Sequence, residues 1–593
     1  MVRDICLDRL KTKAEQNSNE PIYFSYKNNF WQPLTIKNFH TQVRDFAKGL
    51  IAQNLASNSK VAILGFNTVE WVISCWGAQY MGASSVGIYP TNSKEEVLYV
   101  LNHSDAEILV VQHLSAYLSQ VKPIVQEAKN VKLVILMQGE TGQENVMKFS
   151  DFLALGKTIN DAELDKRFNH IKESDVATMI YTSGTTAHPK AVMLSHDAVA
   201  FSARTVSKLY NCQGGDRCIS YLPLAHVAEQ MFSVYAPIEC GLKSYLLPSF
   251  DMLNKAISQI RPTLFFGVPR VYEKIYESLN KSFEQKGKFF KAIIKFFMNF
   301  IYKDFINKCD NKNSDFITNF FTNIARKTLI LKIKEKSGFL QTRIFLSGAA
   351  PLSKDIINFF CSLDMPIYEI YGQSEGSGPT SLNYPKNIKI GTVGKALENT
   401  QLKIADDGEI LLKGPQVFLG YYKDEAATRE TLIDGWLYSG DIGQIDEQGF
   451  LHITDRKKDI LITAGGKNIS PSAIENMLTS IPFVQSAVVI GDKQKFLSAL
   501  FTPDFNSLKE KQEEFGFTMD NNSWQNNQKV LNEINKSLQN INSKLSSVEQ
   551  IKKFSLLNNE FSIDSGEFTP TLKLKRKFVT KKYEQEISKL YQG

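Results

Sequence analysis

The sequence predicts an α/β protein with a large N-terminal domain and a small C-terminal domain. The chain has 593 residues, which exceeds the size at which a single hydrophobic core stops growing. Short β-branched runs alternate with amphipathic stretches as far as residue 455, a pattern typical of helices packed on largely parallel sheets. From residue 436 the pattern changes to a hairpin followed by a charged segment, which indicates a domain boundary.

The composition is that of an ordinary globular protein, with 43% hydrophobic and 22% charged residues. A net charge of +7 without a recognition motif argues against nucleic-acid binding. The seven cysteines include no CxxC pair, which favours a reducing compartment over a disulfide framework or a structural zinc site. Because we find neither a signal-peptide core nor a run of about 18 apolar residues, we expect a cytoplasmic protein without a membrane-spanning helix.

Strands and helices of the first domain are predicted in chain order. The apolar runs at 60–66, 106–112 and 131–137 predict strands, and the amphipathic stretch at 95–102 predicts a helix. A strand at 176–180, a polar loop, a second strand at 191–194 and a helix from about Asp197 follow. The run at 344–346 predicts another strand, which ends in small residues.

The C-terminal part begins with a predicted hairpin at 436–456, where Gly449 supplies a positive φ. Ser470 as N-cap and Pro471 at the first helical position predict a helix there. We place the boundary near Arg456, giving domains 1–455 and 456–593. An apolar stripe between 530 and 545 predicts a helix; packing on the small domain is favoured over binding a partner.

The phosphate loop, residues 181–190, has the sequence YTSGTTAHPK. Hydroxyls, one glycine and one lysine between two strands indicate a site for phosphate oxygens. It is not a Walker A loop, because Lys190 is followed by Ala191 and not by a helix-opening Ser or Thr. Composition alone leaves a plain polar turn equally acceptable. The residue order TSGTT-x-x-PK resembles the AMP-binding signature of the adenylate-forming superfamily, which includes acyl-CoA synthetases, luciferases and peptide-synthetase adenylation domains.

The resemblance implies a large domain with parallel-rich sheets and a β-barrel-like part, followed by a small mobile α+β domain. It also implies that ATP activates a carboxylate as an adenylate, which brings two anions together and requires positive charge. The residues that the resemblance assigns to ATP and AMP are Thr182, Ser183, Gly184, Thr185, Thr186, Lys190, Gly348, Ala349, Ala350, Glu369, Tyr371, Gly372, Gln373, Ser374, Asp441, Arg456 and Lys573.

Within this set the resemblance gives individual roles. Tyr371 stacks on adenine, and Asp441 and Arg456 contact the ribose. Glu375 and Thr182 hold Mg²⁺, whose preference for oxygen ligands suits this chemistry. The residues that the resemblance makes catalytic are Lys190, Thr182, Glu375 and Lys573; Lys573 bridges the substrate carboxylate and the α-phosphate.

Segments 221–232 and 263–275 resemble those of long-chain fatty acid–CoA ligases of the bubblegum type. The residues assigned to the acyl chain are His226, Phe266, Gly267 and Val268; Gly465 and Gly466 are assigned to coenzyme A, and Lys458 to the hinge. The implied substrates are a fatty acid, ATP and coenzyme A. The alternatives are a ligase for aryl or medium-chain acids, a luciferase-like enzyme, and a non-catalytic homologue that binds lipid or nucleotide.

Two features depart from the resemblance or lie outside it. Ala187 and Ala191 stand where most relatives carry glycine, and a methyl group at 187 disfavours positive φ. The basic insertion, residues 281–336, carries thirteen Lys or Arg against five Asp or Glu. Within 287–306 a narrow polar stripe borders a broad aromatic arc, which fits either a helix lying in a lipid headgroup layer or a helix covered by the large domain. The sequence leaves the oligomeric state open.

Overall fold

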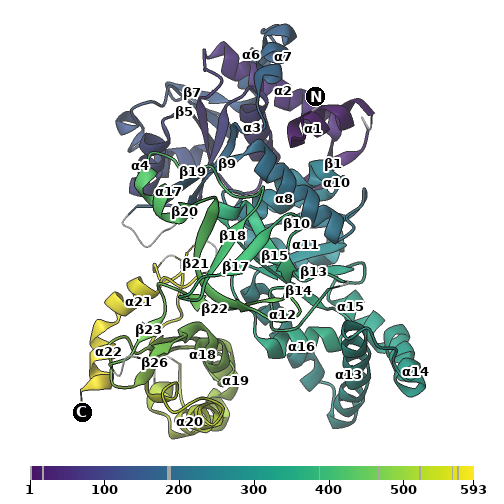
Figure 1. Ribbon diagram of the computed structural model, residues 1–593, viewed down its shortest axis with the longest axis vertical. Helices are drawn as coiled ribbons and strands as arrows, with labels where there is room; N and C mark the ends of the chain where they lie inside the picture. The colour runs from purple at the N-terminus through teal and green to yellow at the C-terminus, as the bar shows by residue number, and fades with distance from the viewer. Residues whose placement is uncertain are drawn as a thin grey trace. The chain divides into compact units, whose positions relative to one another are not determined.

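The computed structural model describes residues 3–16, 19–182, 188–385, 387–464, 467–519, 523–563, 565–569 and 573–592. The chain forms two compact units (Figure 1). Unit 1 comprises Met1–Pro351, Asp355–Leu402 and Leu411–Tyr438; unit 2 comprises Leu352–Lys354, Lys403–Ile410 and Ser439–Gly593. Both units combine helices with sheets, so the predicted α/β class is confirmed. The chain passes between the units within β17 (Gln401–Ile404), β18 (Glu409–Lys413) and β21 (Trp436–Ile445).

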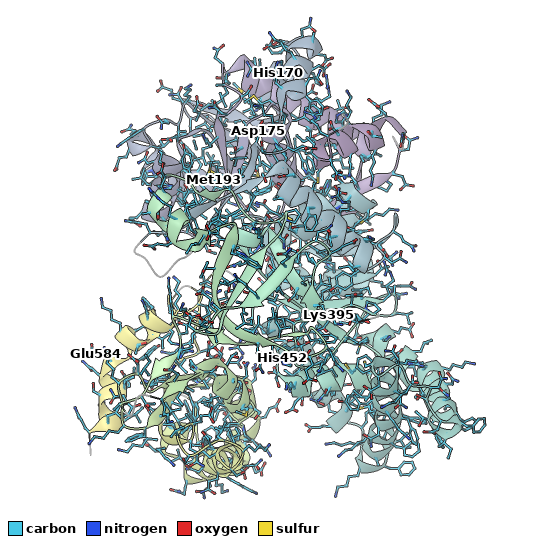
Figure 2. The ribbon with its side chains drawn as sticks, viewed as in Figure 1. His170, Asp175, Met193, Lys395, His452 and Glu584 are labelled. Atoms are coloured by element: carbon cyan, nitrogen blue, oxygen red, sulfur yellow. The ribbon has the colours of Figure 1, made fainter. Side chains whose placement is uncertain are left out.

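Within the described residues, the largest sheet of unit 1 has eight strands in the order β19-β9-β8-β4-β3-β5-β6-β7. From β8 to β7 all neighbours are parallel, whereas β9 is antiparallel to both β8 and β19. The strand bounds are β3 (Lys60–Leu64), β4 (Ser84–Ile88), β5 (Ala106–His113), β6 (Leu133–Gln138), β7 (Val146–Lys148), β8 (Val176–Thr182), β9 (Lys190–Ser195) and β19 (Gly420–Tyr421). Met193 marks β9 in Figure 2.

The parallel strands are buried on both faces, which explains their continuous apolar runs. Val61 and Ile63 of β3 belong to one core, and Ala62 and Leu64 belong to another. The helices of this part are α2 (Ile36–Ala52), α3 (Val69–Tyr80), α4 (Lys94–Ser104), α6 (Phe149–Gly156), α7 (Asp161–His170) and α8 (His196–Leu209). The strands predicted at 60–66, 106–112 and 131–137 and the helix predicted at 95–102 are thus confirmed.

Two further sheets lie in unit 1, and a third, in the order β17-β18-β21-β20, has strands in both units. One has the order β12-β13-β14-β15-β16, with β12 to β14 parallel, and the other has the order β10-β11-β1-β2. The bounds are β12 (Leu264–Gly267), β13 (Ile344–Gly348), β14 (Ile367–Gln373), β15 (Gly378–Leu382), β16 (Lys395–Ala396), β10 (Arg217–Ser220), β11 (Lys243–Leu246), β1 (Pro21–Lys27) and β2 (Phe30–Thr35). Helices α1 (Cys6–Gln16), α11 (Leu253–Ile260), α12 (Pro269–Glu284) and α16 (Lys354–Ser362) accompany them.

The basic insertion forms α13 (Lys288–Cys309), α14 (Phe316–Ala325) and α15 (Leu331–Lys336), and α13 and α14 lie side by side. Ile294 and Ile301 of α13 are buried, whereas the predicted polar stripe is exposed. The apolar and aromatic arc is divided between buried and exposed side chains, since Phe289 is 81% exposed and Phe296 is 45% exposed. One face of α13 is thus covered by the rest of the chain and another is uncovered, and contact with lipid stays a prediction. Among the described residues, no helix combines the length and apolarity needed to cross a bilayer.

Unit 2 contains the predicted hairpin, in which β21 pairs with β22 (Leu451–Arg456), and Gly449 has φ +82°. His452 of β22 is labelled in Figure 2, and its Nε2 lies 3.1 Å from Asp446 Oδ2. A sheet of β25 (Val484–Ile490), β26 (Leu497–Pro503) and β27 (Ile551–Leu556) carries a core on each face. The helices are α18 (Pro471–Leu478), α19 (Phe505–Phe515), α20 (Gln528–Asn542), α21 (Arg576–Lys582) and α22 (Glu584–Tyr591).

Two details of unit 2 correct the sequence predictions. Helix α18 begins at Pro471 as expected, but Ser470 does not cap it with its side chain. Instead Asp455 of β22, which is buried and needs donors, accepts hydrogen bonds from Ser472 N–H at 3.1 Å and Ser470 Oγ at 2.7 Å. Helix α20 packs its predicted stripe on the small core but ends at Asn542, so Leu545 lies beyond it.

Candidate active site

The strands that flank the phosphate loop form an antiparallel hairpin, in which Thr182 of β8 is the partner of Lys190 of β9. Helix α8 begins only at His196, so the predicted departure from a Walker A arrangement is confirmed. Ala191 is buried and lies in the extended strand opposite Tyr181. Its backbone conformation therefore does not require glycine. Ser183, Gly184, Thr185, Thr186 and Ala187 lie outside the described residues.

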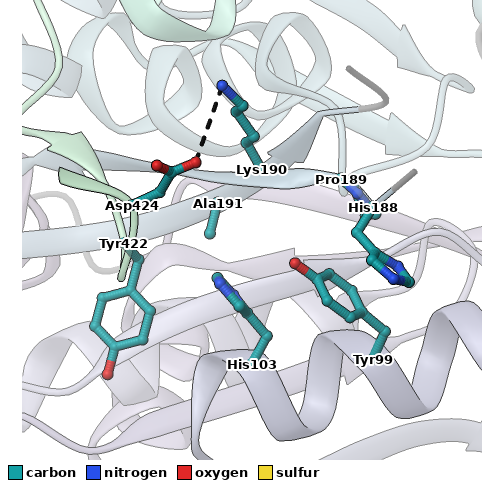
Figure 3. Close-up of a pocket in the computed structure, with 8 residues that line it drawn as sticks. All are labelled: Tyr99, His103, His188, Pro189, Lys190, Ala191, Tyr422 and Asp424. Atoms are coloured by element: carbon teal, nitrogen blue, oxygen red, sulfur yellow. Dashed lines mark ion pairs between the residues drawn. The ribbon is translucent and has the colours of Figure 1, made fainter. Parts of the chain in front are cut away.

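The ammonium group of Lys190 is held at the base of this hairpin. Its Nζ lies 3.9 Å from Asp424 Oδ2 (Figure 3) and 4.8 Å from the ring centroid of Tyr421. The side chain remains 28% exposed. A cation that is oriented by a carboxylate and a ring, but still reaches solvent, can meet an incoming phosphate.

Beside Lys190 lies a cavity of about 320 Å³ (Figure 3). Its walls are Tyr99, His103, His188, Pro189, Lys190, Ala191, Tyr422 and Asp424. Tyr99 of α4 stacks on His188, with ring centroids 4.5 Å apart, and His103 Nδ1 lies 2.8 Å from the Tyr181 hydroxyl. Burial lowers the pKa of His103. His188 is exposed to solvent, and the stacking joins the end of the phosphate loop to α4.

Glu375 lies on a short 3₁₀ turn (Ser374–Gly376) between β14 and β15. Its Oε1 accepts a hydrogen bond from the Tyr421 hydroxyl at 2.7 Å, and its backbone carbonyl accepts one from Phe418 N–H at 2.8 Å. A carboxylate bonded through one oxygen retains a second oxygen for a cation. Glu375 and Lys190 thus share one neighbour, Tyr421.

Several of the residues assigned to ATP and AMP lie at the end of β13 and along β14, which are parallel neighbours with Gly348 opposite Ile370. A Cβ on Gly348 would lie 3.0 Å from the Ile370 carbonyl, and Ala349 has φ +73°, a strained value for a non-glycine residue. The other assigned residues of this part are Ala350, Glu369, Tyr371, Gly372, Gln373 and Ser374. Because both strands are parallel, these residues meet at the carboxyl end of the sheet, where α/β proteins bind ligands.

One glycine on these strands is required by packing of the sheet, and two polar side chains on them are buried. A Cβ on Gly372 would lie 1.7 Å from the Gly378 carbonyl, so no larger residue fits. Ser347 Oγ and Gln373 Nε2 are buried and have no hydrogen-bond partner among the described residues. A polar ligand or a water molecule is a partner that could satisfy both groups.

The two segments assigned to the acyl chain contact each other. Val268 N–H donates to the Tyr221 hydroxyl at 3.3 Å, and the Phe232 and Phe266 rings lie 6.0 Å apart. His226 caps the short helix α9 (Val227–Glu229). A Cβ on Gly267 would lie 2.7 Å from the Tyr272 ring, so this glycine is required for packing.

In unit 2, Asp441 and Arg456 are cross-strand partners on the hairpin, with Asp441 Oδ1 3.5 Å from Arg456 Nε. The Asp441 side chain is 10% exposed, whereas that of Arg456 is 60% exposed. Next to them, Lys457 Nζ pairs with Asp407 at 2.6 Å and Glu409 at 2.7 Å. The two residues assigned to the ribose are therefore preorganised as one group.

Lys573 lies where the chain returns on itself. Thr569 N–H donates to the Lys573 carbonyl at 2.8 Å, and Lys573 N–H donates to Thr569 Oγ1 at 3.0 Å. Three residues later, Arg576 forms a bidentate pair with Glu475, with both distances 2.7 Å. The pair of Arg576 and Glu475 therefore anchors the chain next to Lys573. Lys458 is exposed, and Gly465 and Gly466 lie outside the described residues.

The sequence predictions missed Tyr421, Tyr99 and His103. Tyr421 follows Glu375 by 46 residues, in a segment with no phosphate-binding signature. It reaches Glu375 because β19 pairs with β9, so only the strand register reveals it. Tyr99 and His103 have the four-residue spacing of one helix face, but nothing local distinguishes them from core residues.

Comparison with protein families gives two matches that do not overlap. Residues 10–422 match the AMP-binding enzyme family, over more than half of the chain. The chain belongs to the AMP-binding enzyme family. Residues 458–593 of this AMP-binding enzyme match the AMP-binding enzyme C-terminal domain. The predicted membership of the superfamily is thus confirmed.

The relatives of this AMP-binding enzyme include three proteins named long-chain-fatty-acid–CoA ligase. The chain is 35% identical over 597 residues to ACSBG2 of Xenopus laevis, covering 95% of this chain and 80% of that protein. It is 34% identical to ACSBG2 of Homo sapiens, covering 95% and 88%. It is 32% identical to FadD15 of Mycobacterium bovis, covering 97% and 96%.

Solved structures share the fold at lower identity. The anthranilate CoA ligase AuaEII in complex with anthranoyl-AMP aligns with a TM-score of 0.75 and 19% identity, covering 98% of each chain. The adenylation domain of a carboxylate reductase from Mycobacterium chelonae aligns with a TM-score of 0.76 and 19% identity, covering 99% of this chain and 91% of that one. At this identity the likeness shows the adenylate-forming fold alone.

Proposed function

We propose that this AMP-binding enzyme is a long-chain fatty acid–CoA ligase. It would use ATP to convert a fatty acid to an acyl-adenylate and then transfer the acyl group to coenzyme A. The observation that carries the proposal is the identity of 32 to 35%, over nearly the whole chain, to relatives that are all named for this activity. The arrangement of Lys190, Glu375 and Tyr421 supports it.

In the first step, a fatty carboxylate oxygen attacks the α-phosphorus of ATP, and the bond from that phosphorus to the diphosphate oxygen breaks. Both reactants are anions, so cations must hold them together. Lys190, oriented by Asp424 and the Tyr421 ring, fits the ATP phosphates. We assign Lys573 to the bridge between the carboxylate and the α-phosphate.

In the second step, the coenzyme A sulfur attacks the acyl carbon, the bond from that carbon to the AMP oxygen breaks, and the thiol proton passes to solvent. No side chain has to form a covalent intermediate, so none of the cysteines needs a catalytic role. We assign Gly465 and Gly466 to the pantetheine arm and Lys458 to a hinge between domains 1–455 and 456–593. Asp441 and Arg456 would hold the ribose.

The residues also fit Mg²⁺. Glu375 keeps one carboxylate oxygen beyond its bond to Tyr421, and Thr182 lies opposite Lys190. Among the described residues, no group of three or more His, Cys, Asp or Glu side chains could hold a metal by itself. Mg²⁺ commonly takes one or two carboxylates and completes its shell with substrate phosphates. Bound there, it would neutralise charge on the phosphate oxygens.

We further propose that the basic insertion contacts an anionic lipid surface. Helix α14 adds Phe316, Ile317 and Phe320, which are 82%, 60% and 52% exposed, to the uncovered aromatic side chains of α13. Such exposed apolar side chains among lysines suit the headgroup layer of a membrane. The enzyme would then be cytoplasmic and peripheral, taking fatty acids from that surface.

An acid panel tests the proposed activity. The purified chain is supplied with ATP, Mg²⁺, coenzyme A and either oleate, decanoate, cinnamate or luciferin. We expect diphosphate release and oleoyl-CoA, identified by mass spectrometry, with AMP production rising toward long carbon chains. A preference for cinnamate, decanoate or luciferin would contradict the long-chain assignment. Absence of diphosphate with every acid would instead indicate a non-catalytic homologue.

A further inference from the structure

Tyr421 is buried between the two residues proposed to hold ATP and its metal. Its hydroxyl donates to Glu375 Oε1 at 2.7 Å, and its ring centroid lies 4.8 Å from Lys190 Nζ. The residue is 8% exposed. One aromatic side chain thus contacts an anion through its hydroxyl and a cation through its ring.

The backbone of Tyr421 is fixed from several sides. Strand β19 pairs with β9, placing Tyr421 opposite Val192, two residues after Lys190. Tyr421 N–H donates to Thr428 Oγ1 at 2.9 Å, and Thr428 belongs to α17 (Glu425–Thr431). The ring also packs edge-on against Phe418, with centroids 5.0 Å apart. A ring held in this way keeps its hydroxyl in one place.

Phe418 ties the same segment to Glu375 a second time. Its N–H donates to the Glu375 carbonyl at 2.8 Å, so residues 418–421 hold both the backbone and the carboxylate of Glu375. Burial and the neighbouring Glu375 carboxylate raise the pKa of the Tyr421 hydroxyl. Because a carboxylate oxygen only accepts, the 2.7 Å contact makes the Tyr421 hydroxyl the hydrogen-bond donor.

We propose that Tyr421 is a positioning residue for the nucleotide and its metal. Its hydroxyl donates a hydrogen bond to Oε1 of Glu375, which leaves the other carboxylate oxygen as a ligand for the cation. Its ring face holds the Lys190 ammonium group toward the phosphates. Residues that orient a metal ligand affect metal affinity even though they do not touch the metal. The inference rests on the proposed function, because it assumes that Glu375 binds a metal and Lys190 binds phosphate.

Three variants separate the hydroxyl from the ring. Tyr421→Phe keeps the ring and removes the hydroxyl, whereas Tyr421→Leu removes both. Tyr591→Phe is the matched control, because it also removes one tyrosine hydroxyl, which donates to the Ile490 carbonyl at 3.0 Å and has no role in the proposed reaction. Thermal melting of all three shows whether each variant folds.

The main readout is Mn²⁺ binding in the presence of α,β-methylene-ATP, followed by electron paramagnetic resonance. We expect Tyr421→Phe to weaken Mn²⁺ binding about tenfold, the loss typical of removing a group that orients a metal ligand. Tyr421→Leu should in addition raise the KM for ATP, since Lys190 loses its ring. Neither variant should change the KM for the fatty acid, and Tyr591→Phe should match the wild type.

A double-mutant cycle with Glu375→Gln keeps the test decisive if Tyr421→Phe folds less well. In the Glu375→Gln background, Tyr421→Phe should cause no further loss of Mn²⁺ affinity, because the two residues act as one unit. Additive losses, or equal Mn²⁺ affinity of wild type and Tyr421→Phe, would overturn the inference. Wild-type Mn²⁺ binding without any oleoyl-CoA formation would contradict the proposed function alone.

Discussion

At the scale of single residues, a buried carboxyl group makes stability depend on pH. Glu229, in α9 within segment 221–232, is 1% exposed, and the Ser233 hydroxyl donates to its carboxylate. Burial raises the pKa of Glu229 from 4.5 to about 7, because the charged form loses its hydration. The folded carboxyl therefore keeps its proton to about pH 7, whereas the unfolded one loses it near pH 4.5.

We expect Glu229→Gln to remove a pH-dependent loss of stability. In the wild type, the free energy of unfolding should fall by roughly 3 kcal/mol as pH rises from about 4.5 to about 7. Above about pH 7 it should no longer change through this group. Thermal or urea unfolding at pH 5 and pH 8 measures this difference. The variant should show a smaller difference than the wild type, and Glu533→Gln on the surface of α20 should not. Equal pH dependence in all three proteins would refute the assignment.

At the scale of elements, the insertion is held by its inner face and exposes its outer one. Asp304 of α13 is buried and pairs with Lys308 at 2.8 Å and Arg326 at 3.0 Å, which fastens α13 to the segment after α14. Ile294 and Ile301 pack inward, so the lysines and the aromatic residues Phe289 and Phe316 face outward. A surface with exposed phenylalanines and excess positive charge is complementary to anionic lipid.

Vesicle flotation tests that surface. On vesicles containing phosphatidylserine, the double variant Lys291→Glu/Lys295→Glu should bind at least about tenfold more weakly than the wild type, since each lysine near such a surface contributes about 1 kcal/mol. Phe316→Ser/Phe320→Ser should also weaken binding, including at high salt. The control Lys509→Glu/Lys536→Glu makes the same charge change on α19 and α20 and should float normally. If the wild type and all the variants float equally, or if none of these proteins floats, the membrane proposal is wrong.

At the scale of the whole molecule, the proposed catalytic groups are divided between two compact units. Lys190 and Glu375 belong to unit 1, whereas Asp441, Arg456 and Lys573 belong to unit 2. The segment that carries Lys573 is anchored in unit 2 by the bidentate pair of Arg576 and Glu475. A reaction in two steps can use such a division, because a lysine that is needed for one step can be absent from the other.

Lys573→Ala should therefore separate the two half-reactions. We expect acyl-adenylate formation to fall about a hundredfold or more, the usual cost of removing one group that stabilises transition-state charge. Acyl-CoA formation from supplied acyl-adenylate should remain close to wild type. Lys575→Ala, an exposed lysine two residues away, serves as the control. Similar losses in both half-reactions would contradict the role given to Lys573.

Much of the fold and part of the candidate site could be predicted from the sequence. The buried strands β3, β5 and β6, the hairpin turn at Gly449 and the start of α18 at Pro471 follow from apolar runs, positive φ and proline geometry, all of which are local. The end of α20 could not be placed, because the apolar pattern continues to Leu545 after the helix has ended. Likewise Ser470 has a side chain typical of an N-cap, but its hydroxyl donates to the buried Asp455 carboxylate and does not cap the helix.

The sequence by itself determined the α/β class, the motifs of the AMP-binding family and the residue types of the candidate site, because each depends on neighbours within a few positions. Only the tertiary structure decided that Tyr421 joins Glu375 to Lys190, that Tyr99 stacks on His188, and that one face of α13 is covered. These contacts join segments far apart in the chain. They depend on strand order and register, which are set by the packing of the whole sheet, so no local pattern encodes them.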